Sequence, residues 1–577
     1  MSKVHILAPE IVSKIAAGEV IERPASVLKE LLENSLDAQT KSIEVNLKGA
    51  GKTLIQIKDT GTGIDKEDLD TIFLRHATSK ISRIDDLYQI ASLGFRGEAL
   101  YSISAVSDIT LRSKTNEEDI GWEIHLRGNE KLGSKPVTMQ TGTEVEVKEL
   151  FFNTPARKKF LKSNTAELNR ILDTFMPYTL LYPELPFSLA HDGRKILDLA
   201  PAKNFIQRIA DSLHLEKNNI IEDKRDFAQE DLSVHLVLGD INIQRTRKDM
   251  QFIFINMRPV ENRTISFHLN EIYRLIFSPG VYPFFCAYIN MPAGELDVNV
   301  HPTKRQVKIK DELRLIQVLR PFCEHLLMTK SKAKQAKGIF SVKETTEEKF
   351  QPKTTDKTFS GAQEQQYRLA VEESIALFKT GIIEEKKGDL KEKLKEARYL
   401  GNLLKKYLLF ESPDSLLLLD QHAAQERITF EKLKEQMEKG KVEVQQLLAP
   451  ILIKITAQEL VLWEEVEENL EGIGFQTTLF DKETLAIHGH PQLITQPEVA
   501  VRNLLSGESI AKCDIETLAR KACRSSVMAG FNMNAEQAEY QRAKLLQCRD
   551  PFTCPHGRPT VVEIPEEALS KQFLRNK

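Results

Sequence analysis

The chain has 577 residues, which is too long for a single hydrophobic core, so two to four domains are expected. Its content of 41% hydrophobic and 28% charged residues is typical of a soluble globular protein, and its net charge of −3 excludes a general attraction to nucleic acid. It lacks an apolar run that could span a membrane, a secretory signal and the cysteine density of a disulfide-stabilised protein. We therefore expect a reduced, cytoplasmic protein with no membrane partner.

Residues 1–200 alternate between helical and extended patterns. We expect helices over residues 9–17, from Pro24 onwards with Ser26 as a possible N-cap, over residues 98–106 and over residues 164–175. Apolar alternation predicts strands at residues 43–47, 54–57, 109–113, 122–127 and 144–147. This mixture indicates the α+β class, with helices on one face of a sheet and a domain boundary near residue 200.

Two short blocks in this region carry candidate chemistry. In KELLENSLDA, residues 29–38, Glu30 and Asn34 are four residues apart and share one helix face. A carboxylate at that place can take a proton from water, while an amide oxygen can hold magnesium. In KDTGTGI, residues 58–64, Asp59 ends a strand and can accept a hydrogen bond from adenine N6. Gly61 and Gly63 let a ring approach the backbone.

Two further blocks follow, HATSKI at residues 76–81 and SLGFRGEAL at residues 92–100. Gly94 and Gly97 form a loop before a helix whose free N–H groups suit phosphate oxygens. Each block alone is more often a solvated helix face or an ordinary turn, but four of them in this order indicate a nucleotide site. Neither a Walker pattern nor a Rossmann glycine pattern competes for the nucleotide.

The four blocks resemble the ATP site shared by gyrase, the Hsp90 chaperone, sensor histidine kinases and MutL, known as the GHKL group. The strings ENSLDA, RHATSKI and LGFRGEAL resemble the MutL family of DNA mismatch repair proteins more closely than its relatives. The resemblance implies that Glu30 activates the hydrolytic water, Asn34 binds magnesium and Asp59 reads adenine. The nucleotide-binding residues that it implies are Asn34, Asp59, Gly61, Gly63, Thr78, Ser79, Lys80, Gly94, Phe95, Arg96, Gly97, Glu98, Ala99, Leu100, Thr143 and Lys304.

Residues 201–330 predict a second domain, with strands at 232–239, 252–256 and 284–291 and a helix at 263–276. A helix between parallel strands implies a right-handed crossover, and the resemblance implies a transducer domain like that of ribosomal protein S5. Lys304 follows a proline turn, where most lysines are simply at the surface. The MutL signature N-H-P-x-K implies instead that Lys304 reaches the γ-phosphate, although Val300 separates Asn299 from His301.

Two arginines of this second domain are candidates for DNA binding. We expect Arg258 and Arg263 to line a DNA groove. Met257 stands where relatives commonly carry glycine, so we expect DNA contact from that loop less strongly than from the two arginines.

Residues 331–393 are rich in Lys, Glu, Thr and Gln and poor in apolar residues. Such a segment cannot bury enough surface to offset the chain entropy, so it predicts a disordered linker with a small helical island at residues 367–377.

The C-terminal region, from residue 394, carries a second candidate site. An apolar strand at residues 415–419 precedes a helix from about Gln421, and on that helix His422 and Glu426 share one face. Cys523 lies in a helix that is expected to stop at Gly530, and Cys554 and His556 lie in a turn. Thiolate and imidazole favour zinc, whereas carboxylates also serve magnesium or manganese. Buried thiols and a capping histidine are the structural alternative.

Four strings in this region resemble the MutL members that nick DNA: D-Q-H-A-x-x-E-x-x-x-x-E, A-C-R, C-P-H-G-R-P and a terminal F-x-R. The resemblance implies that Asp420 and Glu426 are catalytic, and that zinc or manganese, or both, is bound there. Glu431 diverges from Glu426 by about 140° on a helix, so we expect it to pair with Arg427 instead. The implied metal ligands are Asp420, His422, Glu426, Cys523, Cys554 and His556.

The segment QQLLAP, residues 445–450, fits the Q-x-x-L-x-P type of peptide that binds the replication sliding clamp through Gln445, Leu448 and Pro450. The start of an apolar strand would explain the same letters. Residues 450–517 are then expected to be a regulatory insertion, and the flanking segments a dimerising, metal-binding core.

Together these features predict a homodimeric mismatch repair protein with an N-terminal ATP switch and a C-terminal, metal-dependent DNA endonuclease. Its implied partners are DNA, a mismatch-recognition protein of the MutS type and the sliding clamp. The main alternative is a MutL protein that couples mismatch recognition to other enzymes without nicking, its C-terminal motifs being structural. A chaperone or a topoisomerase of the same ATPase group is less well supported, because HATSKI and GFRGEAL differ from the strings of those families.

Overall fold

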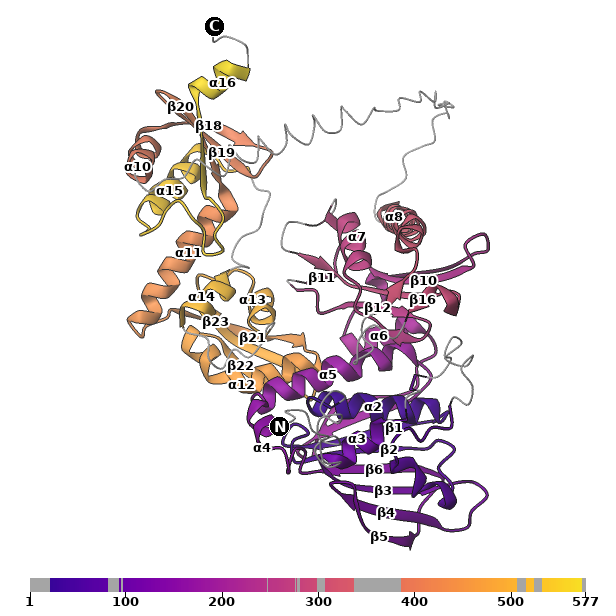
Figure 1. Ribbon diagram of the computed structural model, residues 1–577. Helices are drawn as coiled ribbons and strands as arrows, with labels where there is room; N and C mark the ends of the chain where they lie inside the picture. The colour runs from indigo at the N-terminus through magenta and orange to yellow at the C-terminus, as the bar shows by residue number, and fades with distance from the viewer. Residues whose placement is uncertain are drawn as a thin grey trace, which may run out of the picture.

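The computed structural model describes residues 21–80, 93–94, 97–245, 247–274, 277, 281–297, 307–336, 386–505, 515–523 and 532–572. Figure 1 shows an N-terminal unit, a second unit that follows it, and a C-terminal region that returns to lie beside the first. Several predictions concern residues outside these ranges: the helix at 9–17, Phe95, Arg96, Lys304 with its N-H-P-x-K signature, the island at 367–377, Gly530 and the terminal F-x-R.

The N-terminal unit is an eight-stranded sheet with helices packed on it, in the strand order β5-β4-β3-β6-β2-β1-β7-β8. Residues alternate between buried and exposed along β1, so one face of the sheet meets the helices. The helices are α2 (Pro24–Asp37), α3 (Ala99–Ala105), α4 (Pro155–Phe160) and α5 (Asn164–Leu181), with short 3-10 turns at Lys66–Asp68 and Thr71–Phe73. The strands are β1 (Ile43–Lys48), β2 (Leu54–Asp59), β3 (Asp108–Lys114), β4 (Gly121–Arg127), β5 (Glu130–Val137), β6 (Gly142–Lys148), β7 (Phe187–His191) and β8 (Arg194–Leu199).

This unit confirms the α+β prediction and all five predicted strands. The sequence reading missed β5, β7 and β8; β5 is an exposed edge strand without an apolar face. The N-cap prediction for Ser26 is wrong, because α2 begins at Pro24 with Arg23 as its N-cap. Proline suits the first helical position, where its missing N–H costs nothing.

The second unit is a five-stranded sheet in the order β13-β12-β15-β10-β9. Strands β12 and β15 are parallel and α7 lies between them in sequence, which confirms the predicted crossover. Its strands are β9 (Ile220–Phe227), β10 (Leu232–Gly239), β12 (Gln251–Ile255), β13 (Arg258–Pro259) and β15 (Phe285–Asn290). Two short pairs join β11 (Gln244–Arg245) to β14 (Tyr282–Pro283) and β16 (Leu296–Asp297) to β17 (Lys308–Ile309). Its helices are α6 (Phe205–Leu213), α7 (Arg263–Arg274) and α8 (Glu312–Ala336), with 3-10 turns at Lys217–Asn219 and Ala293–Glu295.

The C-terminal region holds two sheets, β18-β19-β20-β24 and β21-β23-β22. We call β21 to α13, residues 444–505, the insertion. The strands are β18 (Arg398–Leu403), β19 (Tyr407–Ser412), β20 (Ser415–Asp420), β21 (Val444–Lys454), β22 (Gln476–Leu479), β23 (Thr484–Pro491) and β24 (Val561–Pro565). The helices are α10 (Lys386–Glu396), α11 (Gln421–Glu438), α12 (Ala457–Ile473), α13 (Pro497–Leu504), α14 (Ile515–Cys523), α15 (Ala535–Leu546) and α16 (Glu566–Gln572).

Two predicted boundaries need correction. Helix α8 continues to Ala336 and α10 begins at Lys386, so the prediction of disorder is wrong for residues 331–336 and 386–393. The insertion begins before residue 450, because β21 starts at Val444. Among the described residues, none of the helices is both long and apolar enough to cross a lipid bilayer.

Candidate functional site

Helix α2 carries Glu30 and Asn34 along the face that the sequence predicted. Lys29 Nζ lies 3.5 Å from Glu30 Oε1 and 2.9 Å from Glu33 Oε1, and Glu33 also accepts a 2.6 Å hydrogen bond from Tyr178 of α5. Burial opposes the charge on Lys29, but Glu33 and Glu30 outweigh it and raise the pKa of Lys29. Glu30 is therefore an acidic group beside the ammonium of Lys29, and these ion pairs and the Tyr178 hydrogen bond connect α2 to α5.

The Asn34 amide oxygen faces a cation. Lys80 Nζ donates to Asn34 Oδ1 at 3.1 Å and to Asp37 Oδ2 at 2.5 Å. The backbone N–H groups of Leu93 and Gly94 donate to the two oxygens of Asp37 at 2.9 and 3.1 Å. The end of α2 thus binds both the HATSKI block and the glycine loop, and the sequence reading did not single out Asp37.

Asp59 ends β2 and its carboxylate is buried. Its Oδ2 accepts from the Ser35 hydroxyl at 2.8 Å, and its Oδ1 accepts from the N–H groups of Gly61 at 2.9 Å and Thr143 at 3.2 Å. Burial raises the pKa of Asp59 above its ordinary value, although these three donors work in the opposite direction. The carboxylate is fixed in orientation, as selective binding of a base amine requires.

Two glycines of this pocket are required by close backbone contact. A Cβ atom on Gly63, where φ is +79°, would lie 2.2 Å from the carbonyl oxygen of Lys114. A Cβ on Gly97, where φ is +60°, would lie 2.4 Å from the carbonyl oxygen of Ala77. Gly97 therefore closes the glycine loop onto the HATSKI block, and any side chain there would force the two apart.

The described nucleotide-site residues fall into three groups. Asn34 and Lys80 meet at the end of α2, and Thr78 accepts from the Lys80 N–H at 3.2 Å. Asp59, Gly61 and Thr143 form the buried group. Glu98 lies 3.3 Å from His76 Nδ1, just before Ala99 and Leu100 open α3, and Ser79 is exposed. The sequence reading missed Ser113, which donates to the carbonyl of Gly142 at 3.0 Å and has no local motif around it.

Arg258 and Arg263, the two predicted DNA contacts, differ in environment. Arg263 is exposed at the start of α7, whereas Arg258 is buried and donates to the carbonyl of Leu93 at 3.0 Å. Arg258 thus connects the second unit to the loop that holds Asp37. Met257 has φ of +61°, a left-handed conformation that glycine adopts without strain.

Three of the six C-terminal candidate ligands meet between α11 and the 553–559 turn. Glu426, Cys554 and His556 each offer one ligand atom, and these atoms all lie within 4.8 Å of one another. His422 Nε2 is 3.2 Å from Glu426 Oε1, and His556 Nδ1 is 3.3 Å from Glu426 Oε2. We call Glu426, Cys554, His556 and His422 the C-terminal cluster. Thiolate, imidazole and carboxylate are ligand types of zinc, whose tetrahedral ligands stand about 3.3–3.8 Å apart, so the chemistry of this donor set suits such an ion.

Charge within the cluster is strongly perturbed. Burial opposes ionisation of Glu426, but hydrogen bonds with His422 and His556 lower its pKa to about 2. Contacts with Cys554 and then Glu426 raise the pKa of His556 to about 9. Burial, with the Glu426 charge nearby, raises the pKa of Cys523, which is the last residue of α14. Perturbed groups of this kind are concentrated at functional sites.

Asp420 and Glu431 have structural contacts. Asp420 is the N-cap of α11 and accepts from the N–H groups of His422 and Ala423 at 2.9 and 3.0 Å. Glu431 lies 3.5 Å from Arg427 and accepts from the N–H of Arg549 at 2.7 Å, which confirms the prediction that it pairs with Arg427. Its second contact, with the 549–550 turn, was not anticipated.

The QQLLAP segment lies within β21, where the pairing with β23 is interrupted between Gln446 and Ile451. Leu448 is fully exposed in that interval, and Gln445 and Pro450 are exposed as well. All three residues of the predicted clamp-binding peptide are therefore accessible from solvent.

Three family models match this chain in sequence order. Residues 21–153 match the histidine kinase-, DNA gyrase B- and HSP90-like ATPase, residues 215–327 the C-terminal domain of DNA mismatch repair protein, and residues 400–533 the MutL C-terminal dimerisation domain. The chain therefore has a GHKL-type ATPase domain and a dimerisation domain.

Curated relatives match over the whole length. The DNA mismatch repair protein MutL of Clostridium acetobutylicum is 32% identical over 99% of this chain and 100% of that protein. The MutL of Thermodesulfovibrio yellowstonii is 34% identical over 100% of both. A solved structure, the Aquifex aeolicus MutL ATPase domain complexed with ADP, is 33% identical, with a TM-score of 0.37 over 47% of this chain and 93% of that one. By its full-length sequence similarity, this chain belongs to the MutL family of DNA mismatch repair proteins.

Proposed function

We propose that this mismatch repair protein uses its ATP site as a switch and nicks DNA at the C-terminal cluster. The observation that carries the nicking activity is the meeting of Glu426 with Cys554 and His556, which are about 130 residues away in sequence. A buried thiol, a buried carboxylate and a partly exposed imidazole in one place form a donor set for zinc or manganese. A bound metal would supply an activated water and charge stabilisation for phosphodiester hydrolysis.

At the ATP site, each residue has a separate proposed role. Glu30 removes a proton from the attacking water, and Asn34 holds magnesium through its amide oxygen. Asp59 accepts from the adenine amine, because its buried carboxylate is already oriented by Ser35, Gly61 and Thr143. The Gly94–Gly97 loop covers the phosphates, and Lys304 contributes from the second unit.

At the C-terminal cluster, Glu426, Cys554 and His556 hold the metal, with His422 and Cys523 beside them. Asp420 begins the same helix and orients it as its N-cap, which leaves its second carboxylate oxygen for a further ion. The His556 side chain, whose pKa is raised by Cys554 and Glu426, has to lose a proton before it can bind a metal.

The proposed partners follow from the exposed surfaces. The dimerisation domain supports a homodimer. The exposed Leu448, between Gln445 and Pro450, supports binding of a sliding clamp, and the exposed Arg263 supports contact with DNA phosphate. A mismatch-recognition protein of the MutS type is proposed from family membership.

A second candidate function is that of a MutL protein that couples mismatch recognition to other enzymes without cutting DNA. The burial of two of the candidate ligands favours it, since Glu426 is 2% and Cys554 1% exposed and structural zinc sites are closed, although the side chains of His556 and His422 are partly exposed.

Nicking of supercoiled plasmid with manganese separates the two functions. We expect Glu426→Gln and His556→Ala to lose nicking, whereas Glu435→Gln, an exposed position on the same helix paired with Lys439, keeps it. Equal nicking by all of these proteins would contradict the endonuclease proposal and leave the second candidate.

A further inference from the structure

The insertion lies against the N-terminal unit of the same chain, far from its neighbours in sequence (Figure 1). Helix α12 packs on α5. Ala457 and Val461, each 6% exposed, belong to the apolar cluster that forms the core of the N-terminal unit and continues into the second unit. Leu460, Trp463 and Val466, on the other face of α12, belong to the insertion's own core. Helix α12 thus has two apolar faces, one of which is covered by a different folded unit.

A buried ion pair connects the insertion to the second unit as well. Arg245 of β11 lies 3.2 Å from Glu459 of α12, and both side chains are largely inaccessible to water. Arg245 also pairs with Asp249 at 2.9 Å, and Glu459 also accepts from the Thr456 N–H at 2.9 Å in the capping box of α12. Arg502 Nη1 also lies 3.6 Å from Glu459 Oε2, so both charges of the bridge have further partners, as a buried ion pair needs to offset the loss of water.

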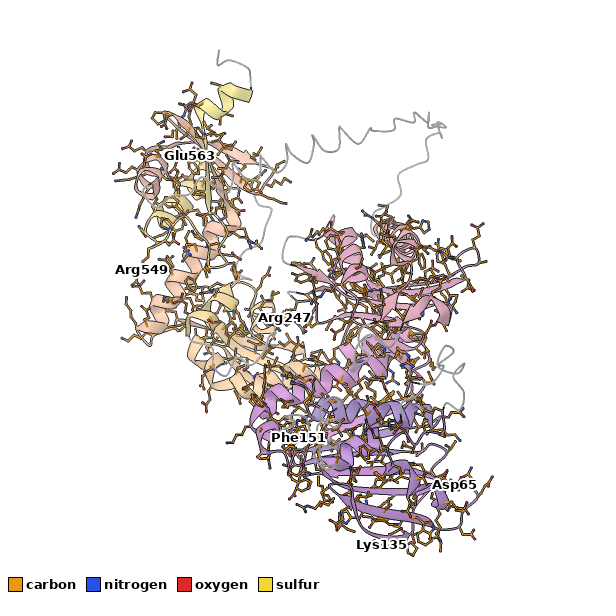
Figure 2. All side chains as sticks on the ribbon, in the orientation of Figure 1. Asp65, Lys135, Phe151, Arg247, Arg549 and Glu563 are labelled. Atoms are coloured by element: carbon orange, nitrogen blue, oxygen red, sulfur yellow. The ribbon has the colours of Figure 1, made fainter. Side chains whose placement is uncertain are left out.

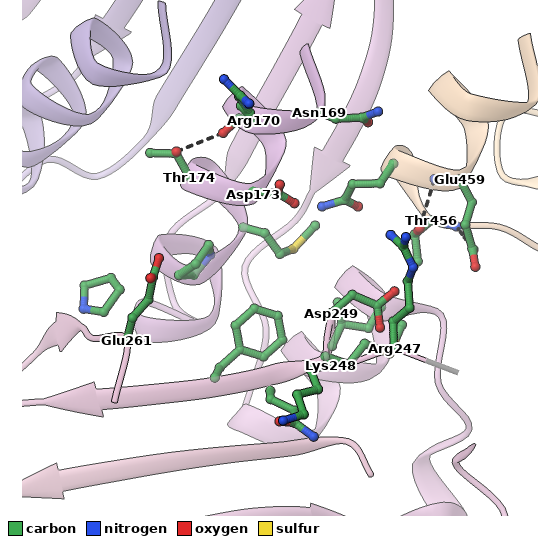
Figure 3. Close-up of a pocket in the computed structure, with 18 of the residues that line it drawn as sticks. Asn169, Arg170, Asp173, Thr174, Arg247, Lys248, Asp249, Glu261, Thr456 and Glu459 are labelled. Atoms are coloured by element: carbon green, nitrogen blue, oxygen red, sulfur yellow. Dashed lines mark hydrogen bonds between the residues drawn. The ribbon is translucent and has the colours of Figure 1, made fainter. Parts of the chain in front are cut away.

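Charge is complementary around this bridge. Helix α12 is acidic, and Glu464 pairs with Arg194 of β8. Figure 2 labels Arg247 on the part of the second unit that faces the insertion, and Figure 3 shows the cavity between the parts, with Thr456 and Glu459 on one side and Asp173 and Asp249 on the other. The cavity measures about 1030 Å³ and is lined by residues of all three units, among them Lys29, Tyr178 and Glu459.

A chain of side-chain contacts connects the insertion to α2, the helix that carries Glu30. Tyr178, on the helix that α12 covers, donates to Glu33, which pairs with Lys29, which in turn lies beside Glu30. The docked insertion also touches the first and second units at once, through α5 and through Arg245. It therefore adds to the direct contacts between these two units, and a movement of the second unit relative to the insertion would disturb the Arg245–Glu459 bridge.

We propose that the insertion is an intramolecular brake: docked through α12 on the junction of the two N-terminal units of its own chain, it slows ATP turnover. This inference rests on the ATPase activity of the N-terminal domain and on the role proposed for Glu30. ATP and the docked insertion then oppose one another, and by linkage ATP weakens docking as much as docking weakens ATP binding.

The first test is a crosslink that does not depend on ATP hydrolysis. Arg194→Cys with Glu464→Cys, in a full-length Cys513→Ser background, is treated with a short bis-maleimide; the cysteines within the described residues are all buried. We expect an internal link within one chain, seen as a monomer of altered mobility and identified by mass spectrometry. A control with Arg194→Cys and Glu435→Cys, at an exposed position of α11, should not link. Absence of the link, or a covalent dimer in its place, would overturn docking within the chain.

The second test measures ATP turnover of the linked protein. We expect the link to lower turnover about fivefold relative to the same variant treated with a monofunctional maleimide. Arg194→Glu should raise turnover about twofold, and adding Glu464→Arg should restore it. Both positions are exposed and outside the ATP site, so folding is preserved. Unchanged turnover on linking would overturn the brake, whereas normal turnover of Glu30→Ala would overturn only the role of Glu30.

Discussion

The two candidate sites of this protein are assembled in opposite ways. The ATP site draws mainly on the first folded unit, with Lys304 proposed to contribute from the second, and most of its residues come from short, ordered blocks between residues 29 and 100. The C-terminal cluster joins Glu426 on α11 to a turn about 130 residues later, across the whole insertion. Most of the first site can thus form when its own domain folds. The second site forms only when the segments on either side of the insertion pack against each other. Four experiments, from the largest expected effect to the smallest, can break or sharpen this contrast.

Loss of the Asp59 carboxylate should have the largest effect. Asp59→Asn replaces one acceptor oxygen by a donor that faces the N–H groups of Gly61 and Thr143 or the Ser35 hydroxyl. We expect nucleotide affinity to fall at least about 100-fold, by the cost of unpaired buried polar groups, measured by titration with a fluorescent ATP analogue. Asp65→Asn, at an exposed position a few residues away, is the matched control. Equal affinities in the two variants would refute the adenine role of Asp59.

The second-largest effect should be the loss of metal affinity when one ligand is removed. This loss should be confined to the C-terminal cluster. His556→Ala removes one ligand of the C-terminal cluster, so zinc affinity should drop about 10- to 100-fold while nucleotide affinity stays unchanged. Because His556 has to be deprotonated, zinc affinity of the unaltered protein should also rise between pH 7 and 9. Competition with a chromogenic chelator measures both, and a flat pH profile would contradict the proposed ligand.

Without metal, the same cluster should make the stability of α11 depend on pH. The raised pKa of His556, about 9, contributes stability that is complete below pH 6.5 and is lost as the pH rises through 9. The lowered pKa of Glu426, about 2, contributes stability that is complete above pH 4.5 and is lost as the pH falls towards 2. We expect a plateau between pH 4.5 and 6.5 and a loss on the order of 2 kcal/mol by pH 10. Amide exchange of α11 with chelator present measures it, and Glu426→Gln should flatten the curve.

The smallest effect concerns the backbone beside Arg258. Met257→Gly relieves a left-handed conformation, where φ is +61°, and should stabilise the second unit by about 0.5–1 kcal/mol in urea unfolding. The control Phe267→Gly, at an exposed position within α7, should instead destabilise the same unit. A loss of stability in the Met257 variant would show that its side chain contributes more than the strain costs.

The sequence predicted what depends on local pattern. Strands β1 to β4 and β6, the parallel crossover around α7 and the ATP blocks all follow from short-range periodicity and glycine spacing. Residue chemistry alone made the ligands of the C-terminal cluster candidates and left a structural alternative open; family resemblance grouped them as one site, because spacing does not show that α11 meets the 553–559 turn. Asp37, Ser113 and the Arg245–Glu459 bridge were missed, since each acts through a partner distant in sequence.

Leu448 bears on how binding can be tested apart from folding. Its side chain gains nothing from folding, because it stays entirely in water where β21 leaves its neighbour. Replacing it should therefore leave the melting temperature unchanged, so a change in the binding of another molecule on this substitution would report on a direct contact. Substitution of Leu448 can therefore test binding to another molecule without a change in the stability of the fold.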